Sequence, residues 1–120
     1  MQNHETIINT KRRVYISGPM TDIPREEYLA AFRQAEDLLR SKGYRRIVNP
    51  IRVWACRWPW LYKIIGYRLT LWYDIQLLKR CDQIHMIRGW QKSAGAKREY
   101  EEARRLDLDV SDDDGLILFG

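Results

Sequence analysis

A loop rich in small residues joins an expected strand to an expected helix in the second half of the chain. The run Gly89 to Glu99 follows an apolar segment, 83–88, that has the pattern of a buried strand, and it leads into a helical pattern that ends at Leu106. A loop of this kind gathers backbone N–H groups at a helix N-terminus, which favours anions such as phosphate. Glu99 comes early in the expected helix, where the dipole keeps a carboxylate ionised. Such a carboxylate suits attack on a sugar that carries a phosphate or a hydroxyl, although a polar loop with a solvated glutamate has the same pattern.

A second strand–loop–helix pattern lies near the start of the chain. Residues 13–17 read as a strand that Gly18 and Pro19 end, and residues 26–41 carry apolar side chains at helical spacing. Those apolar positions are Tyr28, Ala31, Phe32, Ala35, Leu38 and Leu39. In an open parallel sheet both loops lie at the carboxyl edge, where ligands bind. The two loops together predict a ligand site at that edge.

The alternation of strands and helices predicts the fold. We expect strands near 12–17, 45–49 and 83–88, helices near 25–41, 62–80 and 95–106, and a last strand at either 108–110 or 116–119. This order predicts a single-domain α/β protein with a Rossmann- or flavodoxin-like parallel sheet and helices on both faces. We expect a polar leader at 1–11, the domain at 12–110, and an acidic turn followed by an apolar tail at 111–120.

Composition narrows the class of protein. The chain has 120 residues, 45% of them hydrophobic, and its two cysteines lack the spacing of a metal site. The polar start has no apolar segment typical of a signal peptide, and no apolar run reaches the ~20 residues of a membrane span. We therefore expect a cytoplasmic protein with no membrane span, no metal and no cofactor. We expect Cys81 to be an ordinary buried thiol and His85 a packed side chain on a strand.

Short motifs follow one another in a specific order along most of the chain. They are Tyr15 to Met20, Asn49-Pro50, Asp74, Cys81-Asp82, Gly89-Trp90, Ser93, Gly95-Ala96 and Glu99. Together they resemble the nucleoside 2-deoxyribosyltransferase-like superfamily, and most closely a branch of small proteins whose activities are mostly unassigned. The resemblance covers residues 12–107, although residues 51–68 match less well and the tail after Leu108 matches nothing in that superfamily.

The resemblance implies a reaction and a set of residues. Glu99 is similar to the glutamate that attacks C1′ of a (deoxy)ribosyl group and forms a glycosyl–enzyme ester. Tyr15 is similar to the residue that orients this glutamate, and Asp74 to the acid that positions the sugar or protonates the leaving base. The implied substrate-binding residues are Gly18, Pro19, Asn49, Ser93, Gly95 and Ala96. The implied activity is cleavage or transfer at the N-glycosidic bond of a nucleoside or nucleoside 5′-monophosphate.

Ser93 bears on the choice of substrate. In the transferase branch an aspartate usually stands at this position and binds a free 5′-hydroxyl. Deoxynucleoside 5′-monophosphate N-glycosidases instead have a serine that binds the 5′-phosphate. The resemblance therefore favours a monophosphate.

Glycoside cleavage usually needs two carboxyl groups in different protonation states. Glu99 near a helix N-terminus suits the ionised role. Asp74 lies among Leu71, Trp72, Tyr73, Ile75 and Leu77, and desolvation by these neighbours suits the role of the acid.

A basic and aromatic segment separates the two halves of the chain. No acidic residue occurs from Leu38 to Tyr73. Trp54, Trp58 and Trp60 follow Asn49-Pro50 and are expected over the carboxyl edge, either as a lid that stacks a nucleobase or as a dimer contact. The small domain and its separated charges favour a homo-oligomer. Two alternatives stay open: a nucleotide-binding module without turnover, and a nucleic-acid-binding protein that uses this segment.

Overall fold

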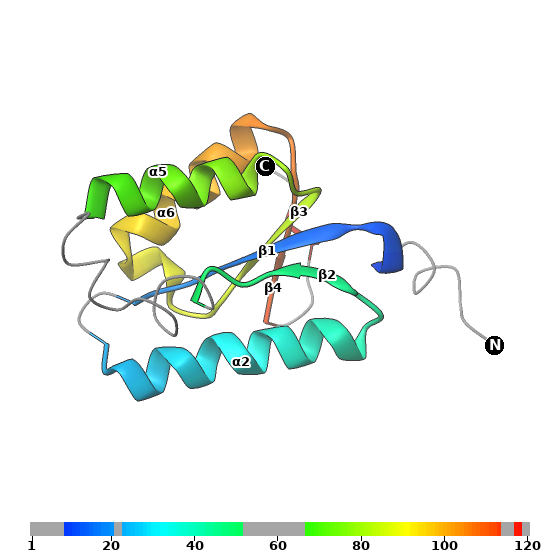
Figure 1. Cartoon of the computed structure of the whole chain (residues 1–120), viewed down its shortest axis with the longest axis horizontal. Helices are drawn as coiled ribbons and strands as arrows, with labels where there is room; N and C mark the ends of the chain where they lie inside the picture. Colours follow the sequence, from blue (N-terminus) through cyan, green and yellow to red (C-terminus); the bar gives the residue numbers. More distant parts are fainter. Residues whose placement is uncertain (1–8, 21–22, 52–66, 114–116, 119–120) are drawn as a thin grey trace.

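One five-stranded sheet organises the chain. The computed structural model describes residues 9–20, 23–51, 67–113 and 117–118 (Figure 1). The sheet has the order β2-β1-β3-β4-β5, with β1 at Arg13–Ser17, β2 at Arg46–Val48, β3 at Gln83–Met86, β4 at Asp109–Asp112 and β5 at Ile117–Leu118. The first four strands in this order are parallel, and β5 pairs antiparallel with β4. The strand order 2-1-3-4 is flavodoxin-like, which confirms the predicted fold class.

Helices cover both faces of the sheet. Figure 1 shows α2 (Arg25–Ser41) on one face and both α5 (Tyr67–Leu78) and α6 (Ala94–Arg105) on the other. The central strand β1 supplies both cores, because successive side chains of a strand point to opposite faces. Val14 and Ile16 pack in the core beneath α2, whereas Tyr15 packs in the core beneath α5 and α6.

The expected elements are present, with small shifts at their ends. The helix expected over 25–41 spans those residues, and the helix expected over 95–106 begins one residue earlier, at Ala94. Both alternatives for the last strand form, because β4 adds a parallel strand and the chain then returns as the antiparallel β5. The helix expected over 62–80 is described as α5 at Tyr67–Leu78, and its first five expected residues, 62–66, lie outside the described ranges.

Local sequence signals set the ends of α2 and α6. Glu26 and Glu27 lie in the first turn of α2 and Arg40 in its last, which suits the helix dipole. Gly43, with φ at 98°, then reverses the chain in a left-handed conformation that glycine adopts without strain. At the start of α6 the Ser93 side chain accepts a hydrogen bond from the Ala96 N–H group, as expected of an N-cap serine.

The carboxyl ends of β1 and β3 pack tightly against each other. The Ile87 N–H group donates to the Ser17 carbonyl at 2.8 Å, directly after β3. A Cβ atom added to Gly18 would lie 2.8 Å from the Ile87 Cβ, so only glycine allows this approach. Gly89 has φ at 90°, and Pro19 lies 3.7 Å from the place of its missing Cβ. The two loops predicted to share the carboxyl edge are therefore in contact, at the point where the strand order reverses.

Candidate active site

Glu99 places a carboxyl group on an otherwise apolar face of α6. The buried residues of α6 are Ala96, Glu99 and Ala103, which stand three and four positions apart and therefore share one face. The two alanines bring the α6 backbone close to the sheet. Glu99 is 7% exposed and belongs to the side of the helix that covers β1 and β3.

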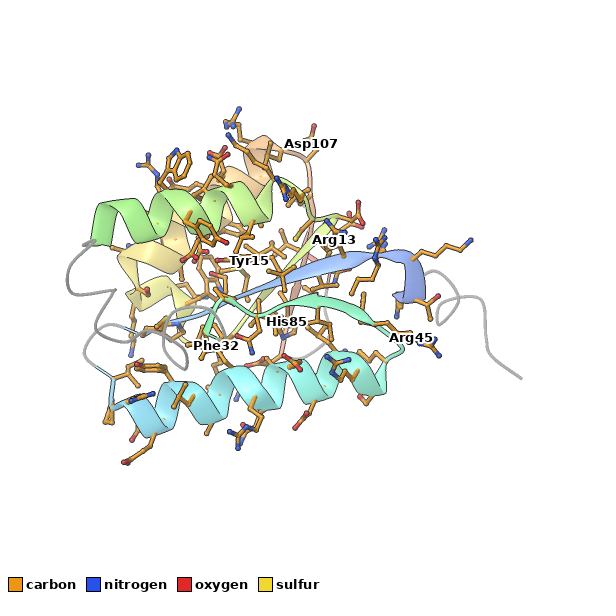
Figure 2. All side chains as sticks on the ribbon, viewed as in Figure 1. Arg13, Tyr15, Phe32, Arg45, His85 and Asp107 are labelled. Atoms are coloured by element: carbon orange, nitrogen blue, oxygen red, sulfur yellow. The ribbon has the colours of Figure 1, made fainter. Side chains whose placement is uncertain are left out.

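Two hydroxyl groups from β1 bind the Glu99 carboxyl group. The Tyr15 hydroxyl donates to Oε2 of Glu99, and the Ser17 hydroxyl donates to Oε1 at 3.0 Å. Tyr15 and Ser17 are two residues apart on the strand, so both side chains point to the α6 side of the sheet. Figure 2 shows Tyr15 between β1 and the helices of that face. Each oxygen of the carboxyl group thus has its own donor.

Burial dominates the electrostatics of Glu99. Burial and, to a smaller extent, the negative charge of Asp74 raise the pKa of Glu99 to about 8, after the hydrogen bonds from Tyr15 and Ser17 have offset part of the rise. The expectation that the helix dipole keeps Glu99 ionised is therefore wrong, because burial opposes the charged form at this position. Glu99 is the sixth residue of α6, and the effect of the dipole falls off within the first turn.

Tyr15 remains a hydrogen-bond donor over the whole physiological range. Burial raises the pKa of Tyr15 well above its ordinary value, and the charges of Glu99 and Asp74 raise it further. The ring is fully buried in the core beneath α5 and α6. Tyr15 can therefore orient the Glu99 carboxyl group without giving up its own proton.

Asp74 approaches the same site from α5. It lies close enough for its charge to raise the pKa values of both Glu99 and Tyr15. Its sequence neighbours enclose it only in part, because Trp72 is 58% exposed and Tyr73 is 38% exposed, and Asp74 itself is half-buried. Consecutive residues of a helix spread around its axis, so apolar neighbours in sequence do not surround a side chain. The structure nevertheless brings Tyr15, Asp74 and Glu99 together from three elements.

Ser93 caps the N-terminus of α6, at the end of the loop where the sequence predicts anion binding. Its Oγ accepts from the Ala96 N–H group at 3.2 Å, which leaves the hydroxyl hydrogen to donate. A short 3₁₀ helix, η1 (Trp90–Lys92), precedes it, and the Trp90 ring lies 4.6 Å from the Tyr100 ring between centroids. This ring contact fastens the loop to α6. Gly95 lies in the first helical turn, where backbone N–H groups need partners from outside the helix, whereas the Ala96 N–H group is already bound by the Ser93 side chain.

Asn49 lies on the other face of the sheet. Its side-chain nitrogen donates to Glu36 of α2 at 3.3 Å, and its side-chain oxygen accepts from the Ile51 N–H group at 3.1 Å. The expected substrate contact of Asn49 is therefore not brought to Glu99. The side-chain nitrogen instead holds the turn after β2 against α2, and the side-chain oxygen closes the turn itself. An asparagine before proline often forms such a local turn.

Ser17 is the site residue that the sequence motifs did not single out. The signal for it was present, because Ser17 stands two positions after Tyr15 on the same strand. The expected lid residues Trp54, Trp58 and Trp60 lie outside the described residues. The family resemblance had included Ser17 only as part of a longer motif.

A second polar cluster occupies the α2 face of the sheet. His85 is 1% exposed and contacts Ser111 Oγ through Nδ1 at 3.0 Å and Asp113 Oδ1 through Nε2 at 3.2 Å. Gln83 Nε2 donates to the same Ser111 oxygen at 2.9 Å. The expectation of a packed histidine is confirmed. The expectation of a buried thiol at Cys81 is also confirmed, and burial raises the pKa of this thiol to about 12.

A cavity of about 300 Å³ also opens on the α2 face. Its walls include Ala31, Ala35, Leu38, Ile87, Arg88 and Asp113. It lies across the sheet from Glu99, so it does not belong to the carboxyl site. Among the described residues there is no group of three or more side chains able to hold a metal ion. None of the helices in the described ranges has the length and apolar character needed to cross a bilayer.

The sequence matches one family model. A family model described as a domain of unknown function, DUF4406, matches residues 12–112. The chain belongs to this family. No curated protein matches the sequence.

Proposed function

We propose that this protein cleaves the N-glycosidic bond of a nucleoside or nucleoside 5′-monophosphate through a glycosyl ester of Glu99. One observation carries the proposal. A buried carboxyl group at the carboxyl edge of a parallel sheet has a separate hydroxyl donor on each oxygen and a second carboxyl group nearby. The motifs shared with the nucleoside 2-deoxyribosyltransferase-like superfamily support this chemistry.

In the first step the ionised Glu99 attacks C1′ of the sugar. The C1′–N bond breaks, its electron pair passes to the base nitrogen, and the base takes a proton from the Asp74 carboxyl group. The Tyr15 hydroxyl holds the attacking carboxylate in place, since a fixed orientation removes part of the entropic barrier. The transition state resembles an oxocarbenium ion, which a nearby carboxylate stabilises.

In the second step water, or a second base, attacks C1′ and releases Glu99. Asp74, now ionised, accepts the proton of the attacking water. The bond between C1′ and the Glu99 oxygen breaks, and its electron pair returns to the carboxylate. The same ester therefore serves hydrolysis and transfer, and the acceptor that reaches it decides between them.

The raised pKa of Glu99 fits this scheme. With a pKa of about 8, raised in part by Asp74, the pair of carboxyl groups retains one proton at neutral pH. Passage of this proton from Glu99 to Asp74 on substrate binding would create the nucleophile and the acid together. Pairs of carboxyl groups that share a proton are a known means of dividing these two roles.

The N-terminus of α6 suits a 5′-phosphate. Ser93 offers a hydroxyl donor, and Gly95 lies in the first turn, where N–H groups face outward and the dipole favours negative charge. We therefore propose a 5′-monophosphate as the preferred substrate. We also propose a homo-oligomer as the working form, since the domain is small and its charges are separated, and the cytoplasm as its location.

Incubation with a panel of nucleosides and 5′-monophosphates, followed by chromatography, tests the proposal. We expect release of free base, and exchange of the base when a second one is added if transfer occurs. Ligand binding without base release would instead identify a nucleotide-binding module. Salt-sensitive binding of oligonucleotides that mononucleotides do not displace would identify a nucleic-acid binder.

A further inference from the structure

Ser17 stands out among the residues around Glu99 because the proposed reaction assigns it no role. Its side chain is 1% exposed, and its hydroxyl lies 3.0 Å from Glu99 Oε1. Its backbone carbonyl accepts from Ile87, which fixes the residue at the junction of β1 and β3. The hydroxyl is therefore held at one place relative to Glu99.

We propose that Ser17 is a positioning residue that acts through Glu99, holding Oε1 while Tyr15 holds Oε2. This inference rests on the proposed function of Glu99 as the nucleophile. A carboxyl group bound at one oxygen can still rotate about its last bond. Two donors, one on each oxygen, fix the plane of the group and leave a lone pair on each oxygen.

The two donors also favour the reactive form of Glu99. Burial opposes the ionised carboxylate, whereas hydrogen bonds from Tyr15 and Ser17 stabilise it. Bonds to an ionised acceptor are roughly twice as strong as bonds between neutral groups. Loss of the Ser17 hydroxyl should therefore leave a larger share of Glu99 protonated at neutral pH.

The decisive variant is Ser17→Ala, with Ser111→Ala as its matched control. Ser111 is a buried strand serine, 6% exposed, that binds Gln83 and His85 on the other face of the sheet. Both variants lose a buried hydroxyl, so both are expected to lose stability. Only Ser17→Ala should change the ionisation of Glu99. Ser17→Cys, whose thiol is a weak donor of similar size, should have a smaller effect.

The first readout is the titration of Glu99 itself, followed by carbon-13 NMR of its carboxyl carbon in the intact protein. The signal is assigned by its disappearance in Glu99→Gln. We expect Ser17→Ala to raise the titration midpoint by about one pH unit, which corresponds to an approximately tenfold change in the ionisation equilibrium. Ser111→Ala should leave the midpoint unchanged. An unchanged midpoint in both Ser17 variants would overturn the inference.

The second readout is the pH profile of kcat/KM on a substrate found with the panel. The activity of the wild type should fall as pH rises through the midpoint of Glu99, because the pair of carboxyl groups then loses the proton that Asp74 needs to act as the acid. In Ser17→Ala this fall should move to higher pH by the same amount as the midpoint. A shifted NMR midpoint with no turnover of any substrate would uphold the action of Ser17 on Glu99 and reject the proposed reaction. Turnover with an unshifted profile would uphold the reaction and reject the role of Ser17.

Discussion

The Tyr15 hydroxyl donates a hydrogen bond to Glu99, a residue 84 positions later in the chain. This contact joins the central strand to α6 across the core that both share. It places an ionisable group where water cannot reach it freely, and burial together with the charge of Asp74 raises the pKa of Glu99 to about 8. A buried carboxyl group weakens the fold whenever it is ionised, so its presence calls for a functional reason.

Glu99→Gln should abolish base release and leave the fold intact. Glutamine keeps an oxygen for Tyr15 and presents an amide to Ser17, but its nitrogen cannot attack C1′ as a carboxylate does. Base release by chromatography and ligand affinity by calorimetry check this prediction. Glu101→Gln, an exposed change on the same helix, is the matched control and should keep full activity. Turnover near the wild-type rate in Glu99→Gln would contradict the assignment of the nucleophile.

Glu99 should also make the protein less stable as pH rises. Below about pH 4.5 the group is protonated in both folded and unfolded chains, so it has no effect. Between that value and about 8 the unfolded chain releases a proton that the folded protein retains, and stability falls. The loss is on the order of a few kcal/mol and is complete above the folded pKa.

Thermal unfolding of the wild type and Glu99→Gln across this pH range checks that prediction. The variant should gain stability relative to the wild type with each step toward alkaline pH. A constant difference between the two proteins from acid to alkaline conditions would show that Glu99 titrates normally.

Ser93→Asp should reverse the preference between nucleosides and 5′-monophosphates. Aspartate is as good an N-cap as serine, so α6 should be retained while a negative charge is added at the phosphate position. We expect the wild type to prefer the monophosphate by at least about tenfold, since hydrogen bonds to a charged group contribute on the order of 1.5–3 kcal/mol. Titration calorimetry with a nucleoside and its monophosphate measures both preferences. Equal affinities in the wild type would place the phosphate elsewhere.

His85 should make the protein sensitive to acid. Burial lowers the pKa of His85 below its ordinary value of 6.5, against the opposing effect of Asp113. As pH falls, the unfolded chain takes up a proton at His85 before the folded protein does. The contribution of His85 to stability is therefore complete above the ordinary pKa of 6.5 and is lost as pH falls from 6.5 through the lower pKa of the folded protein.

His85→Gln should flatten the acid side of the stability profile, although it also lowers stability at all pH values by removing the bonds to Ser111 and Asp113. His4→Gln changes the other of the two histidines and is the control. Chemical unfolding at several pH values measures both. An acid slope in His85→Gln equal to that of the wild type would exclude His85 as its source.

Much of the fold is visible in the sequence because its patterns are local. The helical spacing of Phe32, Ala35 and Leu39 indicates α2, and these three residues are buried in the core beneath it. Strand ends are less well defined, since the strand expected over 83–88 stops at Met86. Ile87 leaves the ladder of β3 to pack against Gly18, a contact between distant segments that no local pattern reveals.

The sequence by itself determined which residue types stand at the carboxyl edge: strand–helix alternation places Glu99 after its loop, and the family resemblance singles out Tyr15 and Ser93. The tertiary structure alone decided their chemical state and their partners. It buried Glu99, brought Asp74 beside it, added Ser17 as a second donor, and turned Asn49 toward α2. The reason is physical: periodicity and capping depend on neighbours within a few residues, whereas desolvation and pairing depend on segments that meet only in the folded chain.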